Sequence, residues 1–326
     1  MVYNSVIGRS SAAALIPEDV SLAILTGVAG SNPLMQMARR LPDMPKSQTR
    51  MPVWSSLPVA YFVTADGGLK KTTEAAWANK YIDAEELAVI VPIPESVLDD
   101  TEYDIWGQLK PELEIAFGVA IAQAVLYGTN IPTTWTTNLG AAGIVAGATA
   151  ATSPTHTISA AAYTDLYEAV LGETAAGTDG LYMLVEADGF GVTGNLAHIS
   201  MRGKLRNVRD ANGVPVFKTS MQDSTRYELD GSPLYFPTDG SMVAASALMI
   251  AGQWDQLVYA MRQDITYKLL DQAVITDANG TIVYNLPQQD MVALRAVMRL
   301  GFALPNPMNR MQTTAASRFP FAVLTA

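Results

Sequence analysis

The stretches RMPVWSSLPVAYFV, residues 50–63, and KYIDAEELAVIVPI, residues 80–93, decide the fold predicted from this sequence. Both are rich in Val, Ile, Tyr and Trp, which favour strands. The polar, glycine-bearing segment between them, residues 64–79, predicts the tip of a long hairpin. Fourteen residues of strand reach about 45 Å, and a two-stranded excursion without a core is only marginally stable. We therefore expect this limb to dock on a neighbouring molecule.

A long helix is predicted downstream of the hairpin, at about residues 103–128. An acidic cluster before it suits a helix N-terminus, and Gly128 is a plausible end. Pro111 predicts a kink, or a short helix followed by a longer one. One apolar stripe follows the three-to-four spacing of a helix, and it consists of Leu109, Leu113, Phe117, Ala120, Ala124 and Tyr127.

The regions before the predicted hairpin and after the predicted long helix have different compositions. Residues 1–44 read as an arm with one short helix at 17–28 and too little apolar periodicity to fold alone. Residues 129–157 are rich in Ala, Gly and Thr and predict a long loop at a domain boundary. A second domain, mixed α+β or α/β, is expected from near Ile158. Its predicted elements are a helix at 161–173, a strand at 181–187, a helix at 195–208 and strands at 213–217 and 232–236.

Strands dominate the sequence after residue 254. Residues 257–261 and 264–270 predict two strands, and Asn279-Gly280 predicts the turn of a hairpin. The segment 290–304 alternates in polarity, so one of its faces is apolar and is expected to cover the long helix. That face consists of Val292, Leu294, Ala296, Met298, Leu300 and Phe302.

Composition excludes several functional classes. Charged residues make up only 16% of the chain, where roughly 25% is usual, so much of the surface should be buried against other subunits. A net charge of −10 excludes a protein that grips nucleic acid by neutralising phosphates. The absence of Cys removes disulfides and thiolate sites. His156 and His198 are too few for a zinc site and are expected to be surface or capping residues. No secretory signal or membrane span is predicted.

One motif imitates an enzyme signature. Gly189, Gly191 and Gly194 form G-x-G-x-x-G, and Asp210 follows about twenty residues on, as in a dinucleotide-binding fingerprint. No further βαβ units follow to complete such a fold, so we interpret the segment as a plain loop. Neighbouring carboxylates such as Glu85 and Glu86 point to opposite faces of a strand and do not converge. We therefore predict no enzyme, and no catalytic, cofactor-binding or metal-binding residues.

The order of these elements resembles the tailed-bacteriophage major capsid proteins of the Hong Kong 97 fold. The C-terminal pattern of that family is similar to AGQWDQLVYAMRQDITYKLLDQA, residues 251–273, followed by DMVALRAVMRLGFALPNP, residues 290–307. The arginines that carry this resemblance are Arg262, Arg295 and Arg299. It extends over nearly the whole chain as architecture, and it implies an α+β capsid fold without a catalytic site.

The resemblance also implies a domain division. It assigns 1–44 to an N-terminal arm, 45–94 to an extended β-hairpin loop, 95–157 to a peripheral domain with a spine helix at about 103–128, 158–253 to an axial domain, 254–303 to return strands of the peripheral domain, and 304–326 to a C-terminal segment. Pentamers and hexamers would then close into an icosahedral shell around double-stranded DNA, without sequence-specific binding. The virion would be the final location, after assembly in the cytoplasm of the host bacterium.

Expected contacts between subunits follow from the same resemblance. Lys70 and Lys71 at the loop tip, and Arg295 and Arg299 on the terminal strand, are predicted to meet acidic groups of a neighbour. Some family members cross-link a loop lysine to an asparagine with the help of a glutamate. Here those positions fall near Asp290 and Val297, which lack that chemistry, so a non-covalent shell is expected. Other implied partners are a separate scaffolding protein, a portal and, in some assemblies, a decoration protein.

Two alternatives stay open from sequence. An encapsulin-like compartment shares the fold and holds enzymes in place of DNA. A nucleotide-binding oxidoreductase rests only on the glycine motif. The identity of the neighbouring genes would distinguish the compartment from a phage shell. A cofactor titration would test the oxidoreductase.

Overall fold

The computed structural model describes residues 33–63, 68–100, 104–152, 154–163, 166–172, 179–209 and 227–326. The chain forms two compact units. Within the described residues, unit 1 contains Glu85–Phe117 and Arg262–Leu300, and unit 2 contains the remainder. Three elements belong in part to each unit, namely α3 (Ile105–Tyr127), β10 (Val258–Leu270) and β13 (Met291–Ala303). The predicted helix at 17–28, the predicted strand at 213–217 and Asp210 lie outside the described residues.

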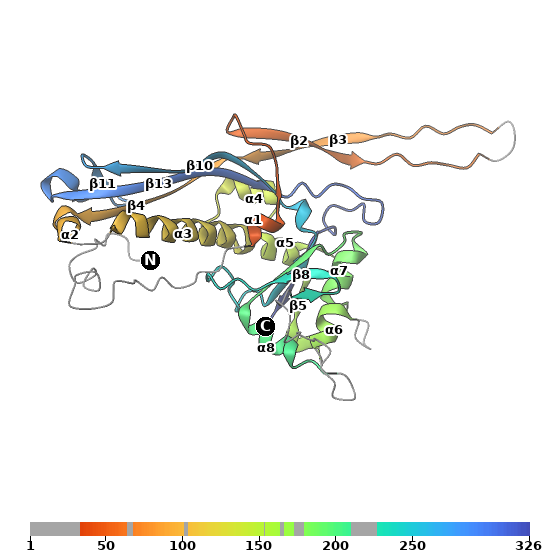
Figure 1. Ribbon diagram of the computed structural model, residues 1–326. Helices are drawn as coiled ribbons and strands as arrows, with labels where there is room; N and C mark the ends of the chain where they lie inside the picture. Colours follow the sequence, from red (N-terminus) through yellow and green to blue (C-terminus); the bar gives the residue numbers. More distant parts are fainter. Residues whose placement is uncertain are drawn as a thin grey trace. The chain divides into compact units, whose positions relative to one another are not determined.

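Unit 1 is built on an antiparallel sheet. Strand β4 (Glu85–Pro94) pairs with β13 from Leu300↔Glu85 to Met291↔Pro94, and β10 lies on the other side of β13 (Figure 1). The expected strands at 257–261 and 264–270 are one continuous strand, β10. The short elements of this unit are α2 (Glu95–Asp99), β11 (Val274–Thr276), β12 (Ile282–Asn285) and η4 (Leu286–Gln288).

Helix α3 packs on this sheet through the face predicted from sequence. Leu113 and Phe117 form one buried cluster with Leu294 and Ala296 of β13, which confirms that the apolar face of 290–304 covers the long helix. The helix runs through Pro111 without interruption, so of the two predicted alternatives the division into two helices is wrong. Proline inside a helix costs about 3 kcal/mol through its lost hydrogen bond and the clash of its ring, and the apolar contacts made on both sides of Pro111 oppose that cost. Gly128 ends the helix with a left-handed backbone, as predicted.

The predicted turn at Asn279-Gly280 connects β11 and β12. The Asp277 carboxylate accepts hydrogen bonds from the backbone N–H groups of Asn279 and Thr281. Gly280 has φ +81°, a conformation that glycine adopts without strain. The hairpin prediction is confirmed because the turn residues carry its geometry locally.

Unit 2 contains a six-stranded sheet with the order β5-β14-β9-β6-β8-β7. The C-terminal strand β14 lies inside it, parallel to β5 and antiparallel to β9. Its strands are β5 (Thr157–Ser159), β6 (Gly194–Ala197), β7 (Glu228–Leu229), β8 (Ser232–Tyr235), β9 (Met249–Gly252) and β14 (Phe321–Thr325). The helices and short elements of this unit are α1 (Leu34–Met37), β1 (Arg39–Arg40), α4 (Thr133–Leu139), α5 (Ile144–Ala150), η2 (Ala160–Ala162), α6 (Leu166–Leu171), α7 (Leu181–Ala187), α8 (Ile199–Arg206) and η3 (Trp254–Gln256).

Three predictions in this unit are wrong. The long loop expected at 129–157 contains helices α4 and α5, each of which buries apolar residues such as Trp135 and Ile144. Residues 181–187 form helix α7 and not a strand, because a short apolar run fits either element until packing decides. The helix expected at 195–208 begins as strand β6, and only its second part is α8.

A separate two-stranded ribbon forms from β2 (Gln48–Ser56) and β3 (Ala76–Asp83), which run side by side in Figure 1. The prediction of one strand from residue 80 to 93 is wrong. The chain instead forms β3, which pairs with β2, and β4, which pairs with β13. The two strands are separated at Ala84, whose N–H donates to Ser47 O. With helices and largely antiparallel sheets in one chain, the fold is α+β, as predicted.

Candidate functional site

The ribbon exposes large apolar side chains to an unusual degree. Trp54 and Trp77 face each other across the strands with ring centroids 4.6 Å apart, yet they are 41% and 62% exposed. Monomeric proteins rarely expose a contiguous apolar patch of this kind, and a larger one marks a surface for another molecule. Six further exposed residues of the same hairpin are Val59, Tyr61, Phe62, Val63, Leu69 and Tyr81.

Among the described residues of the ribbon, the one buried side chain lies at its base. Ile82 of β3 lies in a buried cluster with Met44, Val258, Ala260 and Ala303 of unit 2. Beyond this point the described residues of the ribbon are exposed or half-buried. A two-stranded ribbon without a core is marginally stable in water, so the far part of the ribbon needs support from outside this chain.

Lys70 and Lys71 lie in the connection between β2 and β3, and both are exposed. The Lys71 ammonium lies 5.4 Å from the centre of the Tyr61 ring, within the range of a cation–π contact. The two lysines therefore present positive charge beside the exposed apolar residues of the hairpin.

Arg295 and Arg299 lie on β13 in unit 1, four residues apart on one strand face. Arg299 is already engaged within the chain, because its Nε and Nη2 donate to Glu86 Oε2 at 2.8 and 2.6 Å. Arg295 is exposed and lies opposite Ile90 of β4. The structure thus keeps each predicted pair together, the lysines in unit 2 and the arginines in unit 1.

Asp290 and Val297, which the resemblance places near the cross-linking positions, lie in different environments. Val297 is buried in the sheet of unit 1, opposite Ala88. Asp290 lies just before β13 with φ +47°, and its carbonyl oxygen accepts from Glu95 N–H. Neither residue supplies an amide acyl group or a proton-accepting glutamate.

The glycine motif lies in a setting opposite to that of a dinucleotide fingerprint. That fingerprint needs a strand before the glycines and a helix after them, whereas here helix α7 precedes Gly189 and strand β6 begins at Gly194. A side chain at Gly194 would come within 3.2 Å of the Trp254 ring, so packing explains this glycine. Among the described residues, no three His, Asp or Glu side chains gather as a metal site would require.

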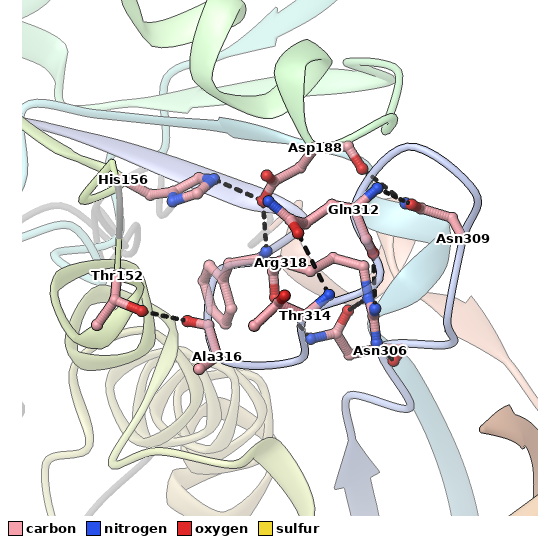
Figure 2. Close-up of polar contacts among 10 residues, drawn as sticks. Thr152, His156, Asp188, Asn306, Asn309, Gln312, Thr314, Ala316 and Arg318 are labelled. Carbon is pink, nitrogen blue, oxygen red and sulfur yellow. Dashed lines mark hydrogen bonds and ion pairs between the residues drawn. The ribbon is translucent and has the colours of Figure 1, made fainter. Parts of the chain in front are cut away.

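A buried polar cluster in unit 2 was not predicted (Figure 2). His156 is fully buried, and its Nε2 lies 2.9 Å from Asp188 Oδ2. Asp188 is also buried and accepts a 2.7 Å hydrogen bond from Phe319 N–H. The expectation of a surface or capping role is therefore wrong for His156. It is confirmed for His198, which caps α8 by accepting from Ser200 N–H.

Arg318 organises the loop before β14. It is 5% exposed, and its guanidinium donates to Asn306 Oδ1, Asn306 O and Gln312 O at 3.0, 3.0 and 2.9 Å. The loop is further tied to α7, because Asn309 Nδ2 donates to Asp188 O at 2.6 Å (Figure 2). This arrangement holds the chain in place as it enters β14.

Burial shapes the protonation of this cluster. It lowers the pKa of His156, and the negative charge of Asp188 opposes that shift only in part. Burial also lowers the pKa of Arg318, again opposed by Asp188. Arginine begins from a value so high that it keeps its charge, so the cluster holds Arg318 charged and His156 neutral at neutral pH. Such a cluster stabilises a fold and offers no exposed reactive group.

No helix within the described ranges is both long and apolar enough to cross a bilayer.

Comparisons of sequence and of structure both match this chain to proteins of bacteriophages. A sequence model described as the phage capsid family matches residues 12–309. The major capsid protein of Staphylococcus phage 80alpha is 27% identical over 283 residues, which cover 85% of this chain and 78% of that protein. A solved structure from Microbacterium phage Oxtober96 has a TM-score of 0.78 at 30% identity, covering 98% of this chain and 99% of that chain. One from Mycobacterium phage Cain has a TM-score of 0.74 at 27% identity, covering 98% of each chain.

Proposed function

Because this chain belongs to the phage capsid family, we propose that it assembles into the pentamers and hexamers of an icosahedral shell that encloses double-stranded phage DNA. Its fold is the Hong Kong 97-like α+β fold, and it is a structural component of the virion. One observation carries the proposal. The ribbon exposes Trp54, Trp77 and their apolar neighbours without an internal core to hold them.

Within this proposal the domain division retains its expected form. Residues 1–44 act as an arm, 45–94 as the extended loop, 95–157 and 254–303 as the peripheral domain, 158–253 as the axial domain and 304–326 as the C-terminal segment. Support comes from the long helix α3 against β13 and from the separate β2–β3 ribbon.

The shell encloses DNA without gripping it. The chain carries a net charge of −10, and affinity for nucleic acid comes mainly from cations that displace counterions from phosphates. A subunit of net negative charge offers packed DNA little electrostatic attraction. Assembly takes place in the host cytoplasm with a scaffolding protein and a portal as partners, and a decoration protein binds the outside where the phage encodes one.

Contacts between subunits are non-covalent. The positions near Asp290 and Val297 lack the acyl donor and the proton acceptor of a lysine cross-link. Obligate contacts of roughly 2,000 to 5,000 Å² per interface supply enough energy without a covalent bond. Lys70, Lys71, Arg295 and Arg299 contribute register at these contacts, because exposed charges at an interface fix orientation more than affinity.

The test removes the apolar surface of the ribbon. Trp54→Ser combined with Trp77→Ser should leave a folded subunit and abolish closed shells, as viewed by negative-stain microscopy of the expressed particles. Tyr167→Ser is the matched control, because Tyr167 is a similarly exposed aromatic outside the ribbon. Wild-type shells from the double variant would contradict the proposal.

A further inference from the structure

Asp83, the last residue of β3, joins the ribbon to helix α4. Its Oδ1 accepts from Gln48 Nε2 of β2 at 2.8 Å, and its Oδ2 accepts from Asn138 Nδ2 of α4 at 3.0 Å. Its main-chain oxygen accepts from the Trp135 indole N–H at 3.1 Å. One residue therefore bridges both strands of the ribbon and two side chains of α4.

Helix α4 is itself fixed to the core of unit 2. Trp135 is buried and packs edge-on against Phe302, with ring centroids 5.3 Å apart. Asn138 is also buried, and its main-chain carbonyl oxygen accepts a hydrogen bond from Leu304 N–H. The side chains of α4 that bond to Asp83 are therefore fixed in place by their burial.

The backbone also comes unusually close at this point. A Cβ atom added to Gly301 would lie 2.5 Å from Asp83 O, a distance that real side chains do not adopt. Glycine is needed so that β13 can pass beside the base of the ribbon. Asp83 is thus hydrogen-bonded to α4 and lies close to the backbone of β13.

The contact lies at the base of the ribbon, where a small rotation displaces the far end by several ångströms. Gln48↔Asp83 is the first pair of the ribbon, and the nine residues of β2 reach about 30 Å from it. A rotation of about 10° at the base moves the far end of the strand by about 5 Å, on that same length. Contacts between subunits require fits far closer than that.

We propose that Asp83, with Asn138 as its partner, is a positioning residue that sets the direction of the ribbon before a neighbouring copy binds it. The inference rests on the proposed shell-building function and adds the residue pair that prepares the subunit for it. Fixing a limb in its bound direction lowers the ordering cost of association.

The carboxylate is needed because it offers two acceptor oxygens to two donors. In Asp83→Asn one acceptor oxygen remains for the two donors, so either Gln48 or Asn138 has no acceptor in the orientation it holds here. In Asn138→Asp two carboxylates face each other. The combined exchange, Asp83→Asn with Asn138→Asp, restores one donor and one acceptor, and the amide oxygen introduced at position 83 can still accept from Gln48.

The experiment compares these three variants with the wild type by microscopy and by thermal unfolding of the unassembled subunit. Each single variant should remain folded and yield about tenfold fewer uniform shells, because a hydrogen bond to a charged group is worth about a factor of ten in a population. The exchange should recover most of the wild-type yield. Asp255→Asn, which removes an exposed carboxylate elsewhere in unit 2, should behave as the wild type.

Two outcomes would overturn the inference. One is a wild-type yield of uniform shells from both single variants. The other is an exchange variant that folds as stably as the wild type and still fails to form uniform shells. If a single variant does not fold, two other variants test the inference. They are the exchange variant and Gln48→Met, which removes the donor to Asp83 Oδ1 and alters only an exposed residue of the ribbon. A wild-type chain that forms no shells would count against the proposed function instead, so the two failures are distinguishable.

Discussion

At the scale of single residues, His156 and Arg318 lie near one buried carboxylate, that of Asp188. Sequence reasoning missed this cluster, because its members lie far apart in the chain and each has a more common surface role. It predicted His198 correctly because a cap depends only on residues nearby. Long-range pairing of polar side chains is decided by packing, which no local pattern records.

The cluster predicts that stability decreases in acid. Burial lowers the pKa of His156 in the folded state below the value near 6.5 that it has when unfolded. The unfolded chain therefore binds an extra proton as the pH falls through about 6.5, and the free energy of unfolding decreases. Denaturant unfolding between pH 7 and pH 5 should show this decrease, with a shallower slope in His156→Gln. Equal slopes in the two proteins would contradict the explanation.

Arg318 gives a prediction independent of pH. Arg318→Lys keeps the charge but cannot span Asn306 and Gln312, so partly buried carbonyl groups lose their donors. We expect the free energy of unfolding to fall by about 2 kcal/mol, measured by denaturant titration. Arg310→Lys is the control, because Arg310 lies exposed in the same loop, and its effect should stay within about 0.5 kcal/mol. Equal effects would show that the hydrogen bonds of Arg318 contribute nothing.

At the scale of elements, prediction succeeded where local chemistry decides and failed where packing decides. The turn at Gly280, the end of α3 at Gly128 and the alternation of β13 depend on short-range geometry. Helix α7 and strand β14 do not. The run at 181–187 is a helix that packs beside β14 and β9 in unit 2, and a short apolar run does not distinguish a helix from a strand. The C-terminal segment gave no signal that its last strand lies inside a six-stranded sheet.

Two glycines of different elements predict opposite effects of one substitution. Gly301→Ala in β13 places a methyl group against Asp83 O and should lower stability by about 1 to 3 kcal/mol. Gly203→Ala in α8 meets no atom within 4 Å and should raise stability by about 0.5 to 1 kcal/mol. Thermal unfolding of both variants checks the pair, and a change of the same sign in both would contradict the packing argument.

At the scale of the whole molecule, the order of elements carried the prediction of the family, and no single motif could have done so.

The lysines of the loop tip and the arginines of β13 are predicted to contact a neighbouring subunit. Lys70→Glu combined with Lys71→Glu should reduce the yield of particles on sucrose gradients, because it reverses the charge offered to a neighbour. Lys46→Glu combined with Lys204→Glu, exposed positions outside the loop tip, should have a smaller effect. Wild-type yield from the loop-tip variant would remove these lysines from the interface.

The absence of cross-linking chemistry near Asp290 and Val297 predicts a shell that separates completely into subunits. Intact particles boiled in detergent should run on a gel as one band of 34.9 kDa. A ladder of covalent multimers would show that another residue pair replaces the missing amide and glutamate.

The central claim is that the β2–β3 ribbon is a limb that a second copy of the chain must support. Sedimentation velocity of the purified full chain at rising concentration tests it most directly. The account predicts that the chain passes into five- and six-subunit assemblies or closed shells, and that protease cleavage within residues 57–63 and 68–75 is lost as they form. A stable 34.9 kDa monomer at high concentration, with those segments protected from protease, would contradict it.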